Sequence, residues 1–322
     1  MRLILRILLT LATLLVSVSC GASMSPEGFA EQQPSKTASV VFTDDLGREI
    51  AIEPPKRVAV TMGSFADIWC LAGGKEQLVA AAADAFTEFD LDLSEDVANL
   101  GAIKEPSMET MLAASPDLVI ASTNLTPNLE MLDTLEALSI PVAYFDASGF
   151  ESYLNMLEIC TRLTGCPENY RLYGEAVEAR MEEARSRASG EAPTVLFLRV
   201  AGTKCSVKNS EGTVLGEMLA DLGCRNLADS DASLLEDLSL EAIVAADPDF
   251  IFAIVAGSDA EAGRRALEET LLSNPAWSGL TAVREGRYYL LDSRLYHLKP
   301  NARWGEAYEQ LAGILYPAKS GA

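Results

Sequence analysis

The chain has 322 residues, of which 25 are Lys or Arg, 47 are Asp or Glu and one is His, for a formal net charge of −22. An apolar fraction of 49% and a charged fraction of 22% are typical of a globular protein, and a chain of this length usually forms two domains or lobes. The net acidity excludes nucleic acid as a partner, because phosphate binding needs a basic surface, and a single histidine excludes chemistry that needs a histidine cluster.

The first 19 residues carry Arg2 and Arg6 and no acidic residue. From Arg6 to Cys20 every intervening residue is apolar or a small hydroxyl residue. A basic start, a short apolar core and a small-residue stop predict a secretory signal peptide over residues 1–19, since the stretch is short for a transmembrane anchor. Without Arg2 and Arg6 the exported chain has 23 basic and 47 acidic residues, a charge of −24.

The leader ends in Ser19-Cys20-Gly21, which resembles a bacterial lipobox whose cysteine is lipidated and becomes the mature N-terminus. Ser17 departs from that pattern, in which a larger aliphatic residue is usual, so ordinary signal cleavage stays open. Residues 20–37 are mostly small and polar and contain proline, which predicts a flexible tether between a lipid anchor and a folded body. We expect the protein on the outer face of the cytoplasmic membrane through lipidated Cys20, or in the periplasm if Cys20 is not lipidated.

Five cysteines remain once Cys20 is set aside, and an odd number leaves at least one thiol unpaired within a monomer. Cys160 and Cys166 could pair if the helix breaks at Gly165, and Cys205 could pair with Cys224. Buried free thiols are the alternative for all of them. No Cys-x-x-Cys occurs, so the sequence supports neither a zinc knuckle nor a thioredoxin-type site.

The folded part is expected to begin with a hairpin over residues 40–53 and a buried strand over 57–61. A helix beginning at Ser64 and a short strand over 79–82 come next. The alternation of strands and helices continues along the chain, which predicts an α/β fold with parallel sheets.

An internal repeat is the most informative feature of the chain. Residues 109–120 and 241–252 share Glu, Ala-Ala and Pro-Asp at an offset of 132 positions. Each copy predicts a helix opened by Ser107 or Ser239, with an acid in its first turn, then Pro-Asp and an apolar strand. Two such units predict two lobes built on one plan.

Between the copies, residues 150–188 predict nearly forty residues of helix with one interruption near Gly165. We therefore expect an N-terminal α/β lobe over 38–149, a connecting helix over 150–190, a C-terminal α/β lobe over 191–317 and a tail over 318–322. Each lobe would hold a central parallel-type sheet flanked by helices.

These features resemble the substrate-binding proteins of bacterial ABC importers, in the iron-siderophore, haem and cobalamin class, whose two lobes are joined by one long helix. The resemblance extends over residues 40–317 and is carried by the stretches 55–58, 99–101, 108–120, 212–219, 238–249 and 274–277. It implies an extracytoplasmic lipoprotein that captures a ferric siderophore, or a related iron or tetrapyrrole ligand, in an interlobe cleft. It also implies that the protein delivers this ligand to an ABC permease dimer with its ATPase. The protein would be a monomer without an intrinsic cofactor, and it would contact the membrane through the lipid only. A haem or cobalamin receptor of the same fold is the alternative.

In this family a glutamate on each lobe docks on arginines of the permease dimer, and the matching positions are Glu109 and Glu241. Two carboxylates in equivalent places can meet two equivalent arginines of a symmetric partner. The alternative is that both acids only stabilise helix dipoles.

Ligands of two-lobe binders lie in the cleft, against the loops that follow the strands. That position selects candidate ligand-binding residues Met62, Ser64, Phe65, Phe86, Asn124, Arg199, Arg294, Tyr296, His297 and Arg303. Lys299 and the three arginines would pair with anionic chelates or haem propionates, or else be surface residues or form ion pairs within the fold. His297, with Met62 opposite, could ligate haem iron, or it could be a hydrogen-bonded or solvent-facing histidine with no role in binding. Trp69, at helical spacing, is expected in the core.

An enzyme of the metallocluster or chelatase type is the competing hypothesis, because such enzymes use a related two-lobe architecture. The chain lacks G-x-S-x-G, P-loop, G-x-G-x-x-G and H-E-x-x-H motifs, so we assign no catalytic residue and expect no enzyme. A zinc or manganese receptor would need several histidine and carboxylate ligands in the cleft, and one histidine argues against it.

Overall fold

The computed structural model describes residues 39–317, apart from residues 90, 189–191, 231–234, 236–238 and 258–259. The predicted signal peptide 1–19, the tether 20–37 with Cys20 and the tail 318–322 lie outside the described residues. Within the described residues, no helix has both the length and the apolar character needed to cross a bilayer.

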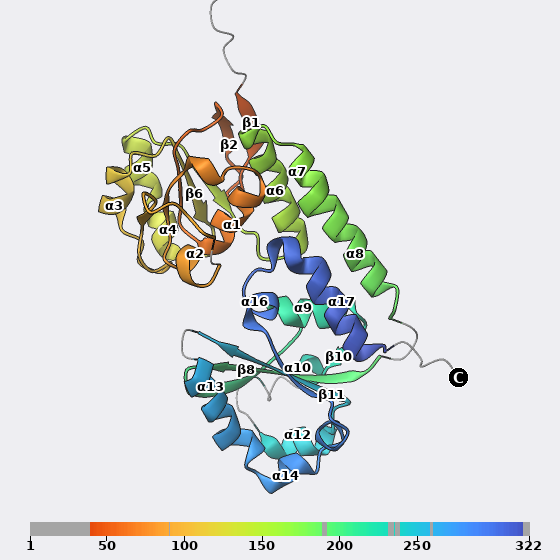
Figure 1. The fold of residues 1–322 in the computed structure, drawn as a ribbon. Coiled ribbons are helices and arrows are strands. Elements are labelled where there is room, and N and C mark those ends of the chain that lie inside the picture. The colour runs from red at the N-terminus through yellow and green to blue at the C-terminus, as the bar shows by residue number, and fades with distance from the viewer. Residues whose placement is uncertain are drawn as a thin grey trace, which may run out of the picture. The chain divides into compact units, whose positions relative to one another are not determined.

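The first lobe contains, among the described residues, a five-stranded parallel sheet in the order β5-β4-β3-β6-β7. Figure 1 shows β6 of this sheet in the same lobe as the helices α1 to α5. Its strands are β3 (Val58–Val60), β4 (Leu78–Ala81), β5 (Ala98–Asn99), β6 (Leu118–Ser122) and β7 (Val142–Phe145). Its helices are α1 (Gly63–Leu71), the 3-10 turn η1 (Lys75–Gln77), α2 (Asp84–Thr87), α3 (Met108–Ala113), α4 (Thr126–Glu130) and α5 (Leu132–Ala137). The predicted hairpin is confirmed as the antiparallel pair β1 (Val40–Thr43) and β2 (Glu49–Ile52).

In the second lobe the described strands run β10-β8-β11-β12, all parallel, and β9 pairs antiparallel with β8. The strands are β8 (Thr194–Ala201), β9 (Lys204–Lys208), β10 (Arg225–Asn226), β11 (Phe250–Ala256) and β12 (Tyr288–Leu291). The helices are α9 (Val214–Asp221), α10 (Leu227–Ser230), α12 (Leu240–Ala246), α13 (Ala260–Leu267), the π-helical turn η3 (Glu268–Leu272), α14 (Pro275–Ser278), α15 (Thr281–Arg284) and α16 (Ser293–Tyr296). The two sheets confirm the predicted fold class.

Alternate residues of each central strand face opposite sides, as a buried sheet requires. In β8, Val195 and Phe197 belong to one apolar cluster and Leu196 and Leu198 to another. The cluster with Phe197 also includes Val60 of β3 and Leu215 of α9, so one apolar cluster continues from one lobe into the other. Burial of this core therefore holds the two lobes in one compact unit.

The connection between the sheets is helical on both sides of a break. Helix α6 (Phe150–Thr164) ends at Gly165, whose φ of 75° is left-handed and suits glycine. The chain resumes through α7 (Glu168–Tyr170), the π-helical turn η2 (Arg171–Glu175) and α8 (Ala176–Arg185), which confirms the predicted interruption. The last helix, α17 (Trp304–Leu315), follows the 3-10 turn η4 (Asn301–Arg303) and packs on α8, where Gly305 allows close approach to Arg180.

The internal repeat begins in the same way in both lobes. Ser107 and Ser239 each cap their helix, and each hydroxyl accepts a hydrogen bond of 3.2 Å from the amide three residues on. Glu109 of α3 and Glu241 of α12 are the second residues of these helices, and both are exposed. The two carboxylates therefore occupy equivalent places on the two lobes.

The repeat also ends in the same way in both lobes. Ser115 and Asp247 have positive φ angles of 50° and 39°, and each directly precedes the Pro-Asp pair. The Asp117 carboxylate then accepts the amide of Arg57 at 2.9 Å, and the Asp249 carboxylate accepts the amide of Thr194 at 2.8 Å. Each aspartate thus joins the start of its own strand to the start of the neighbouring strand, which fixes the register of the central strand pair in each lobe.

The structure corrects the predicted placement of Arg199 and answers the question of disulfides that the sequence left open. The sequence placed Arg199 in a loop, but β8 continues to Ala201 because β9 pairs with it and pairs Ser206 with Arg199. All five cysteines of the described residues are free thiols, so neither Cys160 with Cys166 nor Cys205 with Cys224 forms a disulfide here. Trp69 is fully buried, as expected of a core residue.

Replacing Asp249 with Asn should lower the free energy of unfolding by about 1 kcal/mol at pH 7, because the bonds to Thr194 lose their ionic acceptor. The Thr194 amide holds the pKa of Asp249 below its usual 3.8. A lowered pKa stabilises the fold above 3.8, and that stabilisation disappears as the pH falls through the folded-state value. Urea unfolding should therefore separate wild type from D249N at pH 7, and the difference should shrink as the pH falls below 3.8.

The matched control for this experiment is Glu130→Gln, which neutralises an exposed acid on α4. It should leave stability within about 0.5 kcal/mol of wild type at both pH values. An undiminished difference between wild type and D249N at low pH would contradict the role given to the carboxylate.

Candidate ligand site

A cavity of about 250 Å³ lies where the carboxyl end of β8 faces the loop that follows β7. In parallel α/β sheets, ligand sites form at the carboxyl ends of strands, so the location fits the sequence-based expectation. The lining residues are Ser148, Phe197, Arg199, Gly212, Thr213, Val214, Glu217, Tyr296, His297 and Lys299. Arg199, Tyr296 and His297, which the sequence placed in the cleft, are thus brought together on one wall.

Arg199 and His297 share this wall, and their proximity affects the histidine. Burial lowers the pKa of His297 from its usual 6.5, and the positive charge of Arg199 lowers it further. The imidazole is therefore neutral at pH 7, with a nitrogen free to accept a hydrogen bond or to bind a metal carried by a ligand. The fixed positive charge at this point of the cavity comes from Arg199.

Lys299 adds a second cationic group. Its ammonium donates to the carbonyl oxygens of Asp146 at 2.9 Å and Ala147 at 2.8 Å, both in the loop after β7. It also lies 5.7 Å from the centre of the Phe65 ring, a cation–π distance. Burial lowers the pKa of Lys299 to about 8, against a smaller opposing effect of Asp146, so the ammonium form predominates at pH 7.

Glu217 of α9 is the acidic group of the cavity lining. Burial raises its pKa, while the amide of Gly212 binds the carboxylate and opposes that rise. Glu217, Thr213 and Ser148 are site residues that the sequence pattern did not predict. Glu217 and Thr213 could have been predicted from the helix start at Gly212-Thr213. The Thr213 hydroxyl caps α9 there by accepting a hydrogen bond of 3.2 Å from the amide of Gly216.

The first-lobe candidates lie outside the lining of this cavity. Phe65 is fully buried, and Met62 and Phe86 are half-buried. Ser64 is 3% exposed, and its hydroxyl is one of the buried polar groups of the described residues that lack a partner. Asn124 is exposed, and its amide donates to the carboxylate of Asp146.

Two predicted arginines also lie away from the cavity lining. The Arg294 guanidinium stacks 5.1 Å from the centre of the Phe89 ring. Arg303 pairs with Glu306 at 2.8 Å, the fold-internal ion pair that was the alternative for these basic residues. In the structure, the basic candidates at the cavity are Arg199 and Lys299.

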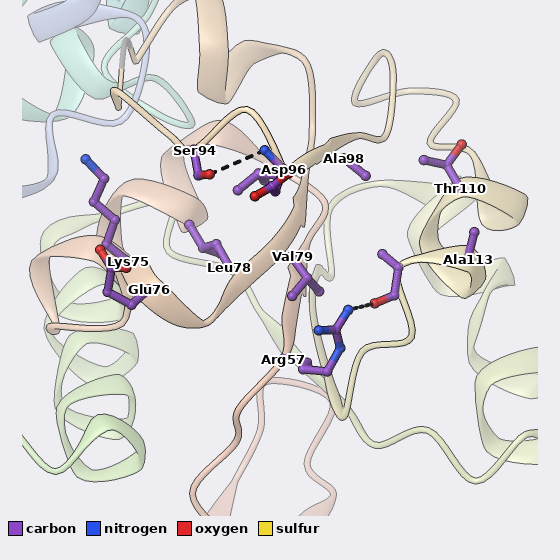
Figure 2. Close-up of a pocket in the computed structure, with 12 residues that line it drawn as sticks. Arg57, Lys75, Glu76, Leu78, Val79, Ser94, Asp96, Ala98, Thr110 and Ala113 are labelled. Carbon is purple, nitrogen blue, oxygen red and sulfur yellow. Dashed lines mark hydrogen bonds between the residues drawn. The ribbon is translucent and has the colours of Figure 1, made fainter.

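A larger cavity of about 590 Å³ opens on the first lobe at the amino ends of β4 and β5 (Figure 2). Figure 2 shows Arg57 bonded to the carbonyl of Ala114 just beyond α3, so its guanidinium is already engaged. The lining also includes Glu76 and Asp96. This cavity lies at the opposite ends of the strands from the predicted ligand site, and its polar groups carry no surplus of positive charge.

The chain matches known proteins over most of its length. A family model described as periplasmic binding protein matches residues 58–295. The protein named "Putative ABC transporter substrate-binding lipoprotein YhfQ" of Bacillus subtilis is 26% identical over 91% of this chain and 92% of its own. The Fe(3+)-citrate-binding protein YfmC of the same organism is 26% identical over 88% of this chain and 87% of its own.

Among solved structures, the periplasmic heme-binding protein RhuT from Roseiflexus sp. RS-1, in its apo form, superposes with a TM-score of 0.65. It is 25% identical and covers 81% of this chain and 98% of its own. The residues that match the family model, 58–295, contain the strands of both five-stranded sheets.

Replacing Gly216 with Ala should distort the cavity wall, because a Cβ at this position would lie 2.5 Å from the carbonyl oxygen of Asn209 and from the hydroxyl of Thr213. Overpacking of this kind typically costs about 1–3 kcal/mol. We expect a lower free energy of unfolding by urea and, because α9 begins at the cavity, weaker ligand binding. Gly313→Ala is the control, since nothing lies within 4 Å of that Cβ and an exposed helical Gly→Ala change should stabilise by up to about 1 kcal/mol. Equal stability of the two variants would contradict the close packing at Gly216.

Proposed function

The chain belongs to the periplasmic binding protein family, and from this premise we propose that it is an extracytoplasmic lipoprotein receptor for a ferric siderophore or related iron chelate. It captures the chelate in the interlobe cavity and delivers it to an ABC permease dimer driven by an ATPase. Lipidated Cys20 holds it on the outer face of the cytoplasmic membrane, and it works as a monomer without a resident cofactor.

The observation that carries the proposal is the cationic wall of the cavity in a strongly acidic protein. Arg199 and Lys299 face a space at the carboxyl ends of the strands, and they suit the carboxylate or phenolate oxygens of an anionic chelate. Two cationic groups repel a bare metal cation. Within the described part of the chain, no three His, Cys, Asp or Glu side chains are grouped to hold a bare ion. Iron therefore enters as cargo inside an organic ligand.

The names of similar proteins support the same cargo class. YfmC is named for ferric citrate, YhfQ for an ABC transporter, and RhuT for haem. The cavity volume of about 250 Å³ favours a compact chelate, because pockets for drug-sized ligands span about 300–1,000 Å³. No step of the proposed function needs bond making or breaking, so the protein acts as a receptor and not as an enzyme of the chelatase or metallocluster type.

The proposal predicts that an iron chelate raises the melting temperature of the purified protein. A ligand at 100 times its Kd stabilises the folded state by about 2.7 kcal/mol. The screen compares ferric citrate, a ferric catecholate, a ferric hydroxamate, haem and cobalamin with iron-free citrate as the control. A shift with a ferric chelate and none with the control is expected, and the absence of any shift would refute the proposed cargo class.

A haem receptor is the second candidate, because His297 lines the cavity with a neutral imidazole. The sequence predicts Met62, on the other lobe, as the second possible ligand of the haem iron. If haem binds, His297→Ala should shift the Soret band of the complex. A Soret band identical in wild type and variant would remove iron ligation by His297, and Met62→Leu tests the opposite ligand in the same way.

The exposed carboxylates Glu109 and Glu241 are proposed to dock on paired arginines of the permease. Reversing both charges, E109R with E241R, should abolish ATP-dependent uptake while leaving the ligand-induced melting shift unchanged, because neither residue lines the cavity. The control reverses two exposed acids elsewhere, Glu130 and Glu269, and should keep uptake. Uptake that survives the double reversal at Glu109 and Glu241 would show that the two acids only stabilise their helices.

A further inference from the structure

Residues 299–301 tie the second lobe to the first at two points. Lys299 donates to the carbonyl oxygens of Asp146 and Ala147, in the loop after β7. Asn301, through its side-chain amide, donates at 2.8 Å both to the carbonyl oxygen of Ser64 and to the carboxylate of Asp67, on α1. The two ties have similar geometry and lie two residues apart in the chain.

Only one of the two ties reaches the cavity. Lys299 is among the lining residues, whereas Asn301 is 1% exposed and is not. An ammonium group has three N–H donors, and the two carbonyl bonds use two of them. Among the described residues Lys299 forms no ion pair, so its charge is held by neutral carbonyls and by the Phe65 ring. A partly buried cation in this state gains from an added anionic partner.

Resting on the proposed function, we propose that the third N–H of Lys299 binds an anionic group of the cargo, so that one ammonium joins the cargo to the 146–147 loop of the first lobe. Lys299 is then both a ligand-binding residue and the tie that couples cargo binding to the contact between the lobes. Cargo that lacks an anionic group would bind without strengthening this tie.

The loop at residues 146–147, whose carbonyls accept the hydrogen bonds of Lys299, is held in place by further hydrogen bonds within the first lobe. The Asp146 carboxylate accepts hydrogen bonds from the Asn124 amide, in the loop after β6, and from the Ser148 hydroxyl. The backbone amide of Asp146 donates to the carboxylate of Asp45 at 2.7 Å. A tighter bond at the Asp146 carbonyl therefore steadies the loops that follow both β6 and β7, and Ser148 carries the effect to the cavity wall.

The test compares wild type with K299M, K299R and N301G on two probes, ferric citrate and a ferric trihydroxamate that has no carboxylate. Asn301→Gly is the matched control, because it removes the other interlobe tie and glycine accepts the φ of 52° at this position. Calorimetric titration measures Kd, and hydrogen exchange with and without ferric citrate measures protection of the amides of residues 145–149. Melting temperatures establish that each variant is folded.

We expect K299M to lose about tenfold or more in affinity for ferric citrate, the equivalent of one charge-assisted hydrogen bond, and to lose the cargo-induced protection of the loop. Its affinity for the trihydroxamate should change by less than about threefold. K299R should keep the preference for ferric citrate, and N301G should melt at a lower temperature with that preference intact. This selectivity between probes is a readout that a purely structural role of Lys299 would not move.

Equal affinity of wild type and folded K299M for ferric citrate, or equal loop protection in both, would overturn the inference and leave the receptor function standing. The same loss with both probes would also overturn it, since Lys299 would then act only on the fold. If K299M does not fold, the test uses wild type and K299R alone. In that case the inference is refuted if saturating ferric citrate does not protect the loop amides of wild type from hydrogen exchange. Failure of wild type to bind any iron chelate would instead refute the proposed function, and this inference with it.

Discussion

The ammonium group of Lys299 lies between two carbonyl oxygens of the first lobe while its backbone belongs to the second. Charge in this protein is otherwise overwhelmingly negative, at −22 for the whole chain, so an anionic ligand approaches against the net field. In the proposed receptor, local charge at short range therefore holds the ligand, and Arg199 and Lys299 are the cationic residues in the cavity lining. Desolvation makes a buried cation without an ionic partner costly, and an anion that enters the cavity offsets that cost.

The repeated unit explains how the cavity and the two acids proposed for docking can coexist on one chain. Asp117 and Asp249 join the starts of equivalent strand pairs, and Ser107 and Ser239 begin equivalent helices. Each unit thus presents a loop edge for ligand at the carboxyl ends of its strands and a capped helix bearing one glutamate. Burial of one apolar cluster along both sheets then keeps the two units together.

Much of the fold could be predicted from sequence because its signals are local. Hydrophobic alternation, serine caps and Pro-Asp breaks placed the β1–β2 hairpin, β3, β4 and both copies of the repeat within a residue or two of their observed bounds. Site residues were harder to predict, because loop position does not determine which way a side chain faces. Phe65 follows a strand as predicted, yet packing buries it completely beneath Lys299. Arg303 was a reasonable cleft cation, but Glu306 of α17, three residues on in the chain, forms an ion pair with it. Glu217 went unnoticed because acids on a helix usually face solvent, and only tertiary packing brings this one to the cavity.

Capture of an iron chelate by the cationic wall is the central claim, and the position of iron in a complex tests it most directly. Crystals of the protein grown with ferric citrate and measured at the iron absorption edge should show one anomalous peak between the lobes. That peak should lie beside the cavity, with an anionic oxygen of the chelate within hydrogen-bonding distance of Arg199 or Lys299. An iron peak at the first-lobe cavity near Arg57, or a fully occupied chelate that contacts neither Arg199 nor Lys299, would contradict the account.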